Sequence, residues 1–141
     1  MKYLLDTCVL SEFVKPEPDA RLLGWLSATP EPTLHVSTLT LGEIQQGISR
    51  LPTSARRQRL QHWLDDDVCT RFAGRLLAAD AAVCLLWGQL RAQAAVQGVT
   101  LPVMDALIGA TALAHGLMLV TRNERDFAQI PGLLLSNPWR E

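Results

Sequence analysis

The sequence of 141 residues has few cysteines, few aromatic residues and no long apolar run. Its three cysteines, Cys8, Cys69 and Cys84, are an odd number without close pairing, so we expect buried thiols in a reducing compartment rather than disulfides. No run approaches the ~18 apolar residues of a membrane span, and the apolar start before Asp6 is too short for a signal-peptide core. These absences predict a cytoplasmic protein without a membrane-spanning segment.

A strong charge of either sign is also missing, because the formal net charge is −1. The whole molecule therefore does not attract nucleic acid at long range, and any such binding would depend on local patches. Hydrophobic residues make up 48% of the chain and charged residues 19%, which is the balance of a folded protein. The length matches one domain spanning residues 1–141.

Short apolar runs alternate with segments of helical periodicity along the chain. The apolar runs predict strands at residues 3–5, 34–37, 76–77, 117–120 and 133–135. Helical spacing, with capping and breaking residues at the ends, predicts helices at 8–13, 19–28, 40–49, 54–64, 80–97 and 102–114, and a short one around Phe127. Strands separated by helices indicate an α/β fold, a three-layer sandwich with a central parallel sheet.

Four acidic residues, Asp6, Glu43, Asp105 and Asp126, stand where this fold could bring them together. Asp6 and the segment 121–126 each follow a predicted strand, and parallel sheets bind ligands outside the carboxyl ends of their strands. Asp105 opens the helix before the fourth strand, and Glu43 lies in the helix after the second. Both could therefore reach the same edge of the sheet.

Each acid also has an ordinary structural explanation. Asp6 could be a turn residue, Asp105 a helix N-cap, Glu43 a solvated helix residue and Asp126 a charge favoured at a helix N-terminus. Asp6 and Asp105, however, lie in segments that are otherwise apolar, with no obvious basic partner nearby in sequence. A buried carboxylate needs compensation, and a bound cation would supply it.

An all-oxygen site selects a hard ion such as Mg²⁺ or Mn²⁺. Zinc is disfavoured because His35, His62 and His115 are scattered and no cysteine pair has ligand spacing. A carboxylate-held Mg²⁺ can activate water against a phosphodiester, whereas no catalytic Ser–His–Asp arrangement or glycine-rich phosphate loop is visible. The acids therefore favour phosphodiester hydrolysis.

Arginines near these acids are candidate phosphate contacts. Arg122 and Arg125 flank the acidic edge. A second cluster gathers around one helix and consists of Arg50, Arg56, Arg57 and Arg59. Arginine-rich helix faces are more often simply solvated, so both explanations stay open for that cluster.

Five segments carry a resemblance to a known family. They are residues 4–12, 41–44 with Gly47, 104–112, 121–127 and 136–139. Together, and in this order, they resemble a PIN domain of the VapC toxin type, and the closing Ser-Asn-Pro-Trp is similar to the FitB-like branch. The resemblance implies a Mg²⁺- or Mn²⁺-dependent endoribonuclease, the toxin of a type II toxin–antitoxin pair. It also implies a VapB-like or FitA-like DNA-binding antitoxin, RNA as substrate, and a homodimer that forms larger complexes with the antitoxin.

The resemblance assigns roles by position. The residues concerned are Asp6 and Asp105 as principal metal ligands, Glu43 as third acid, Asp126 with the turn 121–123 as fourth corner, and Thr7 and Thr121 as groups that orient water or ligands. Many relatives have an acid where Asn123 stands. The fourth ligand is therefore open between Asp126, the Asn123 carbonyl, and a single-metal site that RNA completes.

Two other functions remain as alternatives. An aspartate-based phosphatase would use Asp6 as nucleophile, but it would need a second acid where Cys8 stands. A non-catalytic module would keep the fold and bind antitoxin or RNA without cutting. Asp6→Asn separates the non-catalytic module from an enzyme, because it removes toxicity only where Asp6 is catalytic, and trapping by beryllofluoride on Asp6 would support the phosphatase.

Overall fold

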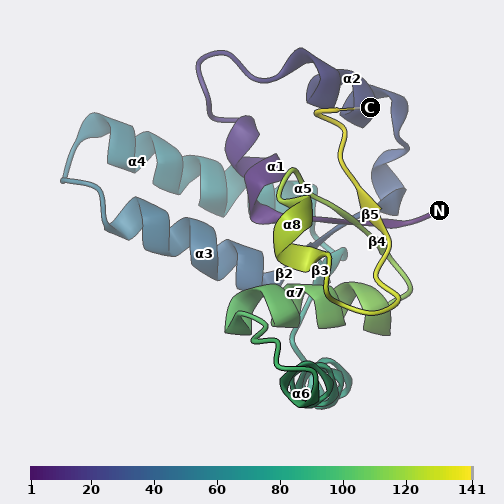
Figure 1. Cartoon of the computed structure of the whole chain (residues 1–141). Helices are drawn as coiled ribbons and strands as arrows, with labels where there is room; N and C mark the ends of the chain where they lie inside the picture. The colour runs from purple at the N-terminus through teal and green to yellow at the C-terminus, as the bar shows by residue number, and fades with distance from the viewer. Residues whose placement is uncertain (141) are drawn as a thin grey trace.

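A five-stranded parallel sheet forms the centre of the computed structural model, which describes residues 1–140 (Figure 1). The strands are β1 (Tyr3–Leu5), β2 (Leu34–Ser37), β3 (Leu76–Leu77), β4 (Met118–Val120) and β5 (Leu135–Ser136). Their order is β3-β2-β1-β4-β5, and every neighbouring pair is parallel. The predicted α/β class with a central parallel sheet is confirmed, and β1 lies at its centre.

Helices cover both faces of the sheet. They are α1 (Thr7–Glu12), α2 (Ala20–Ala28), α3 (Thr38–Ser49), α4 (Ala55–His62), α5 (Cys69–Arg71), α6 (Ala81–Val96), α7 (Val103–Ala114) and α8 (Glu124–Phe127), with shorter or wider turns at η1 (Glu31–Thr33) and η2 (Trp63–Val68). The α3–α4 hairpin, residues 38–62, projects to one side, and α6 packs against α7 (Figure 1). No helix among residues 1–140 is long and apolar enough to cross a membrane.

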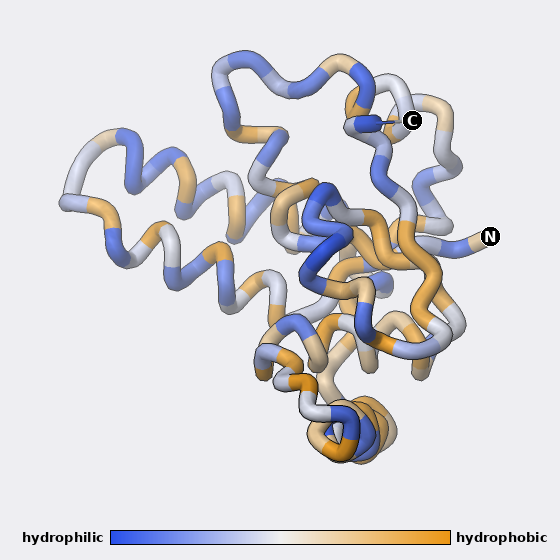
Figure 2. Tube along the Cα trace, in the orientation of Figure 1, coloured by the Kyte–Doolittle hydropathy of each residue, from blue (hydrophilic) through white to orange (hydrophobic). Residues whose placement is uncertain are grey.

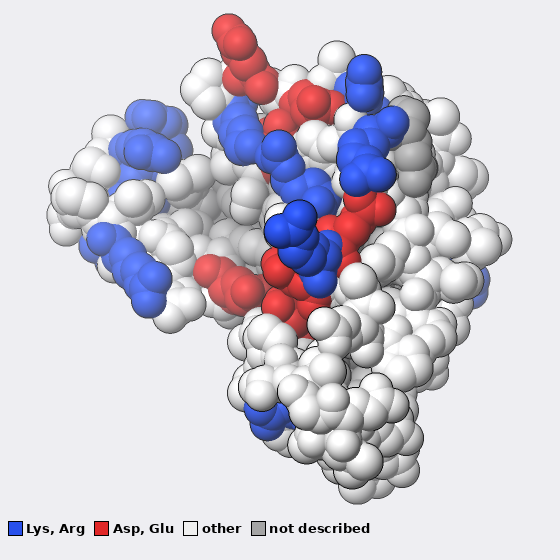
Figure 3. Space-filling view, in the orientation of Figure 1, with Lys and Arg blue, Asp and Glu red and all other residues white. Residues whose placement is uncertain are grey.

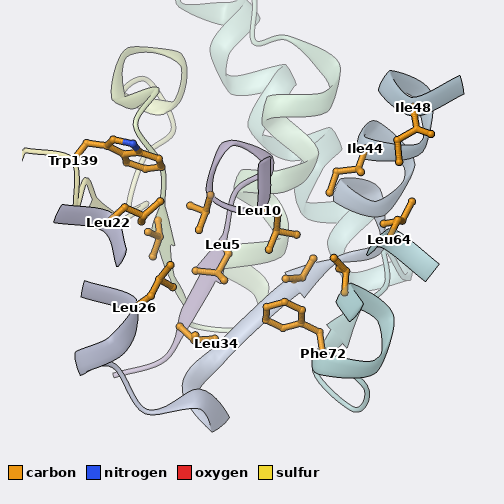
Figure 4. Close-up of a cluster of buried hydrophobic side chains, with 14 residues drawn as sticks. Leu5, Leu10, Leu22, Leu26, Leu34, Ile44, Ile48, Leu64, Phe72 and Trp139 are labelled. Atoms are coloured by element: carbon orange, nitrogen blue, oxygen red, sulfur yellow. The ribbon is translucent and has the colours of Figure 1, made fainter. Parts of the chain in front are cut away.

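Alternation along the strands gives each face its own core. Leu5 and Val120 belong to one buried cluster, which includes residues of α1, α2 and α3, and Leu4 and Leu119 belong to the other, with α6 and α7. Successive strand side chains point to opposite faces, so adjacent apolar residues serve both cores. Figure 2 shows the hydrophobic residues concentrated on the strands, and Figure 4 shows the first cluster.

Three local predictions are wrong. The helix predicted over 54–64 continues as the π-helix η2 and as α5, because this wider turn keeps Leu64 and Val68 buried in the core. The last strand lies at Leu135–Ser136, where it pairs with β4, rather than at 133–135. The Cys84 thiol was expected to be buried but is exposed, because it follows the buried Val83 on the solvent side of α6.

Candidate metal centre

Asp6 lies at the carboxyl end of the central strand β1, where it caps helix α1. Its Oδ1 accepts a hydrogen bond from the Thr7 amide at 2.9 Å, and its Oδ2 accepts one from the Thr121 hydroxyl at 2.8 Å. Asp6 is only 7% exposed. Burial raises the pKa of Asp6 above its ordinary 3.8, although both hydrogen bonds lower it. Asp6 is therefore a fixed and poorly solvated carboxylate.

Glu43 reaches the same edge from helix α3, which follows the neighbouring strand β2. The Thr7 hydroxyl donates to Glu43 Oε1 at 2.7 Å and lies 3.4 Å from the Thr40 hydroxyl. Because β1 and β2 are neighbours, helix α1 contacts helix α3 beside the carboxyl ends of these two strands. Thr7 thus connects the Asp6 segment to Glu43.

Asp105 lies in the first turn of α7 but does not cap it, because the N-cap position is Pro102. Its pKa is raised above 3.8 by burial first, and then by the negative charges of Asp126, Asp6 and Glu43. The charges of all three other acids predicted from the sequence therefore act on Asp105. Figure 3 shows acidic side chains gathered at the middle of one face, between the α3–α4 hairpin and α8.

Asp126 is an exposed residue in the first turn of α8, and it has the largest effect on Asp105 of the three neighbouring charges. Asn123 contributes through its backbone instead, because its amide donates to the Thr121 hydroxyl oxygen at 3.0 Å. Thr121 therefore joins this loop to Asp6. Among residues 1–140, no group of three or more His, Cys, Asp or Glu side chains is arranged so that it could hold a metal ion.

Cys8 is a contact that the sequence analysis missed. Its Sγ lies 3.7 Å from Asp6 Oδ2 and 3.7 Å from the Thr121 hydroxyl oxygen. Burial, and then the charge of Asp6, raise the pKa of Cys8 above its ordinary 9.0. The thiol is thus kept protonated and donates to Asp6. Its position two residues after the strand-end acid was the only sequence signal for this contact.

The arginines divide according to their position. Arg56 lines a groove of about 260 Å³ together with Thr7 and Glu43, so it stands beside the acids. Arg57 turns inward, and its guanidinium donates to the Leu51 carbonyl at 3.2 Å. On the other side of the acids, the exposed Arg122 and Arg125 belong to the loop and helix that carry Asp126.

Thr7→Val should test the connection to Glu43, because valine keeps the shape but loses the hydroxyl. We expect the free energy of unfolding to fall by about 1 kcal/mol, as for one net hydrogen bond. Hydrolytic turnover at this site should fall by about tenfold, as when a group that orients a metal ligand is lost. Chemical denaturation and single-turnover kinetics measure the two effects. Thr7→Ser should restore both, and unchanged turnover in Thr7→Val would show that Glu43 does not need this contact.

Comparisons with known proteins place the chain among characterised toxins. Residues 3–133 match the PIN domain family. The chain is 38% identical over 136 residues to VapC ribonuclease Y4jK of Sinorhizobium fredii, covering 96% of each protein. It is 31% identical over 138 residues to Toxin FitB of Neisseria gonorrhoeae, covering 98% of this chain and 99% of that one. A solved structure of FitAB bound to an IR36 DNA fragment superposes with a TM-score of 0.89 at 30% identity, covering 97% and 95% of the two chains.

Proposed function

Because the chain belongs to the PIN domain family, we propose that it is an endoribonuclease and the toxin of a toxin–antitoxin pair. Relatives that align over nearly its whole length are named as a ribonuclease and as a toxin. The observation that carries the chemistry is that the charges of Asp6, Glu43 and Asp126 all act on Asp105 at the carboxyl edge of the sheet. Such a set of oxygen donors suits a divalent cation and, through it, phosphodiester hydrolysis.

The donor set fits Mg²⁺ or Mn²⁺. Asp6 and Asp105 would be the principal ligands, because Asp6 is buried, Asp105 is half-buried, and both have raised pKa values that a cation would reverse. Glu43 would be the third acid, and Asp126 the fourth, since it is the strongest of the charges acting on Asp105. Asp126 is exposed, and Glu43 is oriented by the Thr7 hydroxyl at 2.7 Å. A bound ion would supply Lewis-acid chemistry, lowering the pKa of a water so that it could lose its proton and attack phosphorus, and stabilising charge on the leaving oxygen.

The remaining side chains hold and orient these groups. Thr121 and the Thr7 amide fix both oxygens of Asp6, and the Thr7 hydroxyl orients Glu43. Arg122 on the loop and Arg125 in α8 would contact RNA phosphates, because guanidinium groups bind phosphate in a bidentate manner. The chain itself is nearly neutral, so such local contacts would hold the RNA strand.

A DNA-binding antitoxin is the partner that we propose. The solved FitAB structure includes DNA, and the present chain superposes on it over 97% of its length. By analogy, a FitA-like or VapB-like protein would bind and silence this chain, a homodimer would form the core of the complex, and the enzyme would act in the cytoplasm, where RNA is its substrate. Copurification with the product of a neighbouring short gene tests this partner.

The phosphatase alternative loses support at Cys8. A thiol stands where that reaction needs a second acid, and it donates to Asp6 rather than assisting it as a proton acceptor. The non-catalytic alternative is separated from the enzyme by Asp6→Asn, which should abolish growth arrest only where Asp6 is catalytic.

Metal dependence should be visible in a direct cleavage assay. We expect the purified protein to cut bulk transfer RNA or structured RNA with Mg²⁺ or Mn²⁺, to stop in EDTA, and to resume when the ion is restored. An Asp6→Asn preparation made in the same way controls for contaminating nucleases. RNA that stays intact with both ions, together with no measurable binding of either ion by calorimetry, would contradict the proposed function.

A further inference from the structure

Trp139 lies beneath the arginine that follows the catalytic loop threonine. The Arg122 guanidinium carbon is 5.4 Å from the centroid of the Trp139 ring, which is a cation–π distance. Arg122 comes directly after Thr121, whose hydroxyl binds Asp6 at 2.8 Å. The Trp139 ring therefore acts on a cation that is one residue away from the proposed metal centre.

The Trp139 ring is firmly held. The residue is only 9% exposed and packs in the first core cluster, beside Leu22 of α2 (Figure 4). Its amide donates to Asn137 Oδ1 at 3.1 Å, and Arg21 donates to its carbonyl at 3.2 Å. The backbone of Trp139 is held by these hydrogen bonds and its ring by the core, so the ring gives Arg122 a rigid support.

Apolar packing alone does not account for an indole at this position. Within residues 1–140, the buried Trp139 Nε1 has no hydrogen-bond partner, and an unpaired buried N–H is unfavourable. Phenylalanine or leucine would bury apolar surface without that loss. Tryptophan, however, offers a cation the strongest ring face of the aromatic side chains. The ring face under Arg122 is thus the property that distinguishes this residue.

In the described part of the chain, Arg122 forms no ion pair with an acidic side chain. The charge of Arg122 acts on Glu12, but the pKa of Glu12 is lowered first by its hydrogen bond with Lys15 and only last by Arg122. Glu12 already binds Lys15 Nζ at 2.8 Å and the Asp19 amide at 2.9 Å. The N–H groups of Arg122 are therefore available to an anionic ligand beside the four acids.

We propose that Trp139 is a positioning residue for RNA binding: its ring holds the Arg122 guanidinium where it contacts a phosphate of the RNA strand next to the metal centre. The inference rests on the proposed ribonuclease function and adds a source of substrate affinity to it. A guanidinium that is already held loses less freedom when it binds, so phosphate contact is stronger than for a free side chain.

Binding of labelled, mixed-sequence single-stranded RNA to Asp6→Asn protein, which does not cut it, tests the proposal. Arg122→Gln should weaken affinity by about tenfold and reduce the slope of log affinity against log salt by about 0.7, the value for one phosphate on a single strand. Trp139→Leu should weaken affinity by about threefold through the same contact. Trp139→Phe should restore most of this loss. In the Arg122→Gln background, Trp139→Leu should have no further effect on RNA binding.

A second stacked pair provides the matched control. The Arg71 guanidinium lies 5.1 Å from the Phe13 ring, is paired with Glu31, and lines a cavity that includes none of the four acids, so Phe13→Leu should leave RNA affinity and its salt slope unchanged. Should Trp139→Leu fail to fold, Trp139→Phe takes its place. Trp139→Phe should lower RNA affinity by less than threefold, and it should have no effect on affinity in the Arg122→Gln background.

Additive effects of Trp139 and Arg122, or a salt slope that Arg122→Gln does not move, would overturn the positioning role while leaving the ribonuclease in place. Absence of any RNA binding by the Asp6→Asn protein would overturn the proposed function and this inference together.

Discussion

Replacing Asp6 with asparagine should reduce RNA cleavage on the order of 10³-fold while the protein stays folded. Asparagine can still cap α1 by accepting from the Thr7 amide, and the Thr121 hydroxyl can accept from the new amide group. What is lost is the negative charge that a divalent ion needs at the centre of the site. Single-turnover cleavage at saturating Mn²⁺ measures the effect, and induced expression in growing cells should no longer arrest growth.

Asp80→Asn is the matched control for this prediction. Asp80 also caps a helix, accepting from the Val83 amide at 3.1 Å at the start of α6, and the change removes the same charge from an exposed position. We expect full cleavage from Asp80→Asn. Asp6→Asn protein should still copurify with its antitoxin. Growth arrest that persists in the Asp6→Asn protein would favour the non-catalytic binding module.

The carboxyl edge of the sheet was predictable from sequence because strand ends are marked by a change of residue type. Leu4 and Leu5 are buried on opposite faces, and the first polar residue after them is Asp6. The same pattern places Thr121 after β4. Periodicity therefore indicated both the parallel sheet and the residues at its rim, including the partial burial of Asp105 in an otherwise apolar helix.

The contacts between these residues were not predictable in the same way. Thr7 and Glu43 are separated by 36 positions, and Asp6 and Thr121 by 115. Both pairs meet because β1 lies between β2 and β4, an order that apolar periodicity does not specify. Trp139 under Arg122 depends further on β5 joining the edge beside β4. Local patterns thus identified the acids, and strand order determined which side chains support them.

Asp105→Asn should make the metal-free protein more stable and abolish its stabilisation by Mn²⁺. Burial and three neighbouring negative charges act against the Asp105 carboxylate, so a neutral amide relieves them. In the native protein, Mn²⁺ at about 100 times its Kd should add about 2.7 kcal/mol, which is about 8 °C in Tm for a domain of this size. Thermal unfolding in EDTA and in Mn²⁺ compares the two proteins, and the exposed Glu17→Gln controls for loss of one charge.

The pH dependence of stability independently tests the raised pKa values of Asp6 and Asp105. Asp6 and Asp105 have raised folded-state pKa values, so their contribution to stability is complete below 3.8 and is lost as pH rises through the raised values. Metal-free protein should therefore gain stability relative to Asp105→Asn as pH falls from neutral toward 3.8. Glu12 acts oppositely, since its hydrogen bond with Lys15 lowers its pKa from 4.5, but it is present in both proteins and cancels from the comparison. Protons compete with the cation, so the Tm gain from Mn²⁺ should shrink over the same interval, and a gain that stays constant would place the ion away from these two carboxylates.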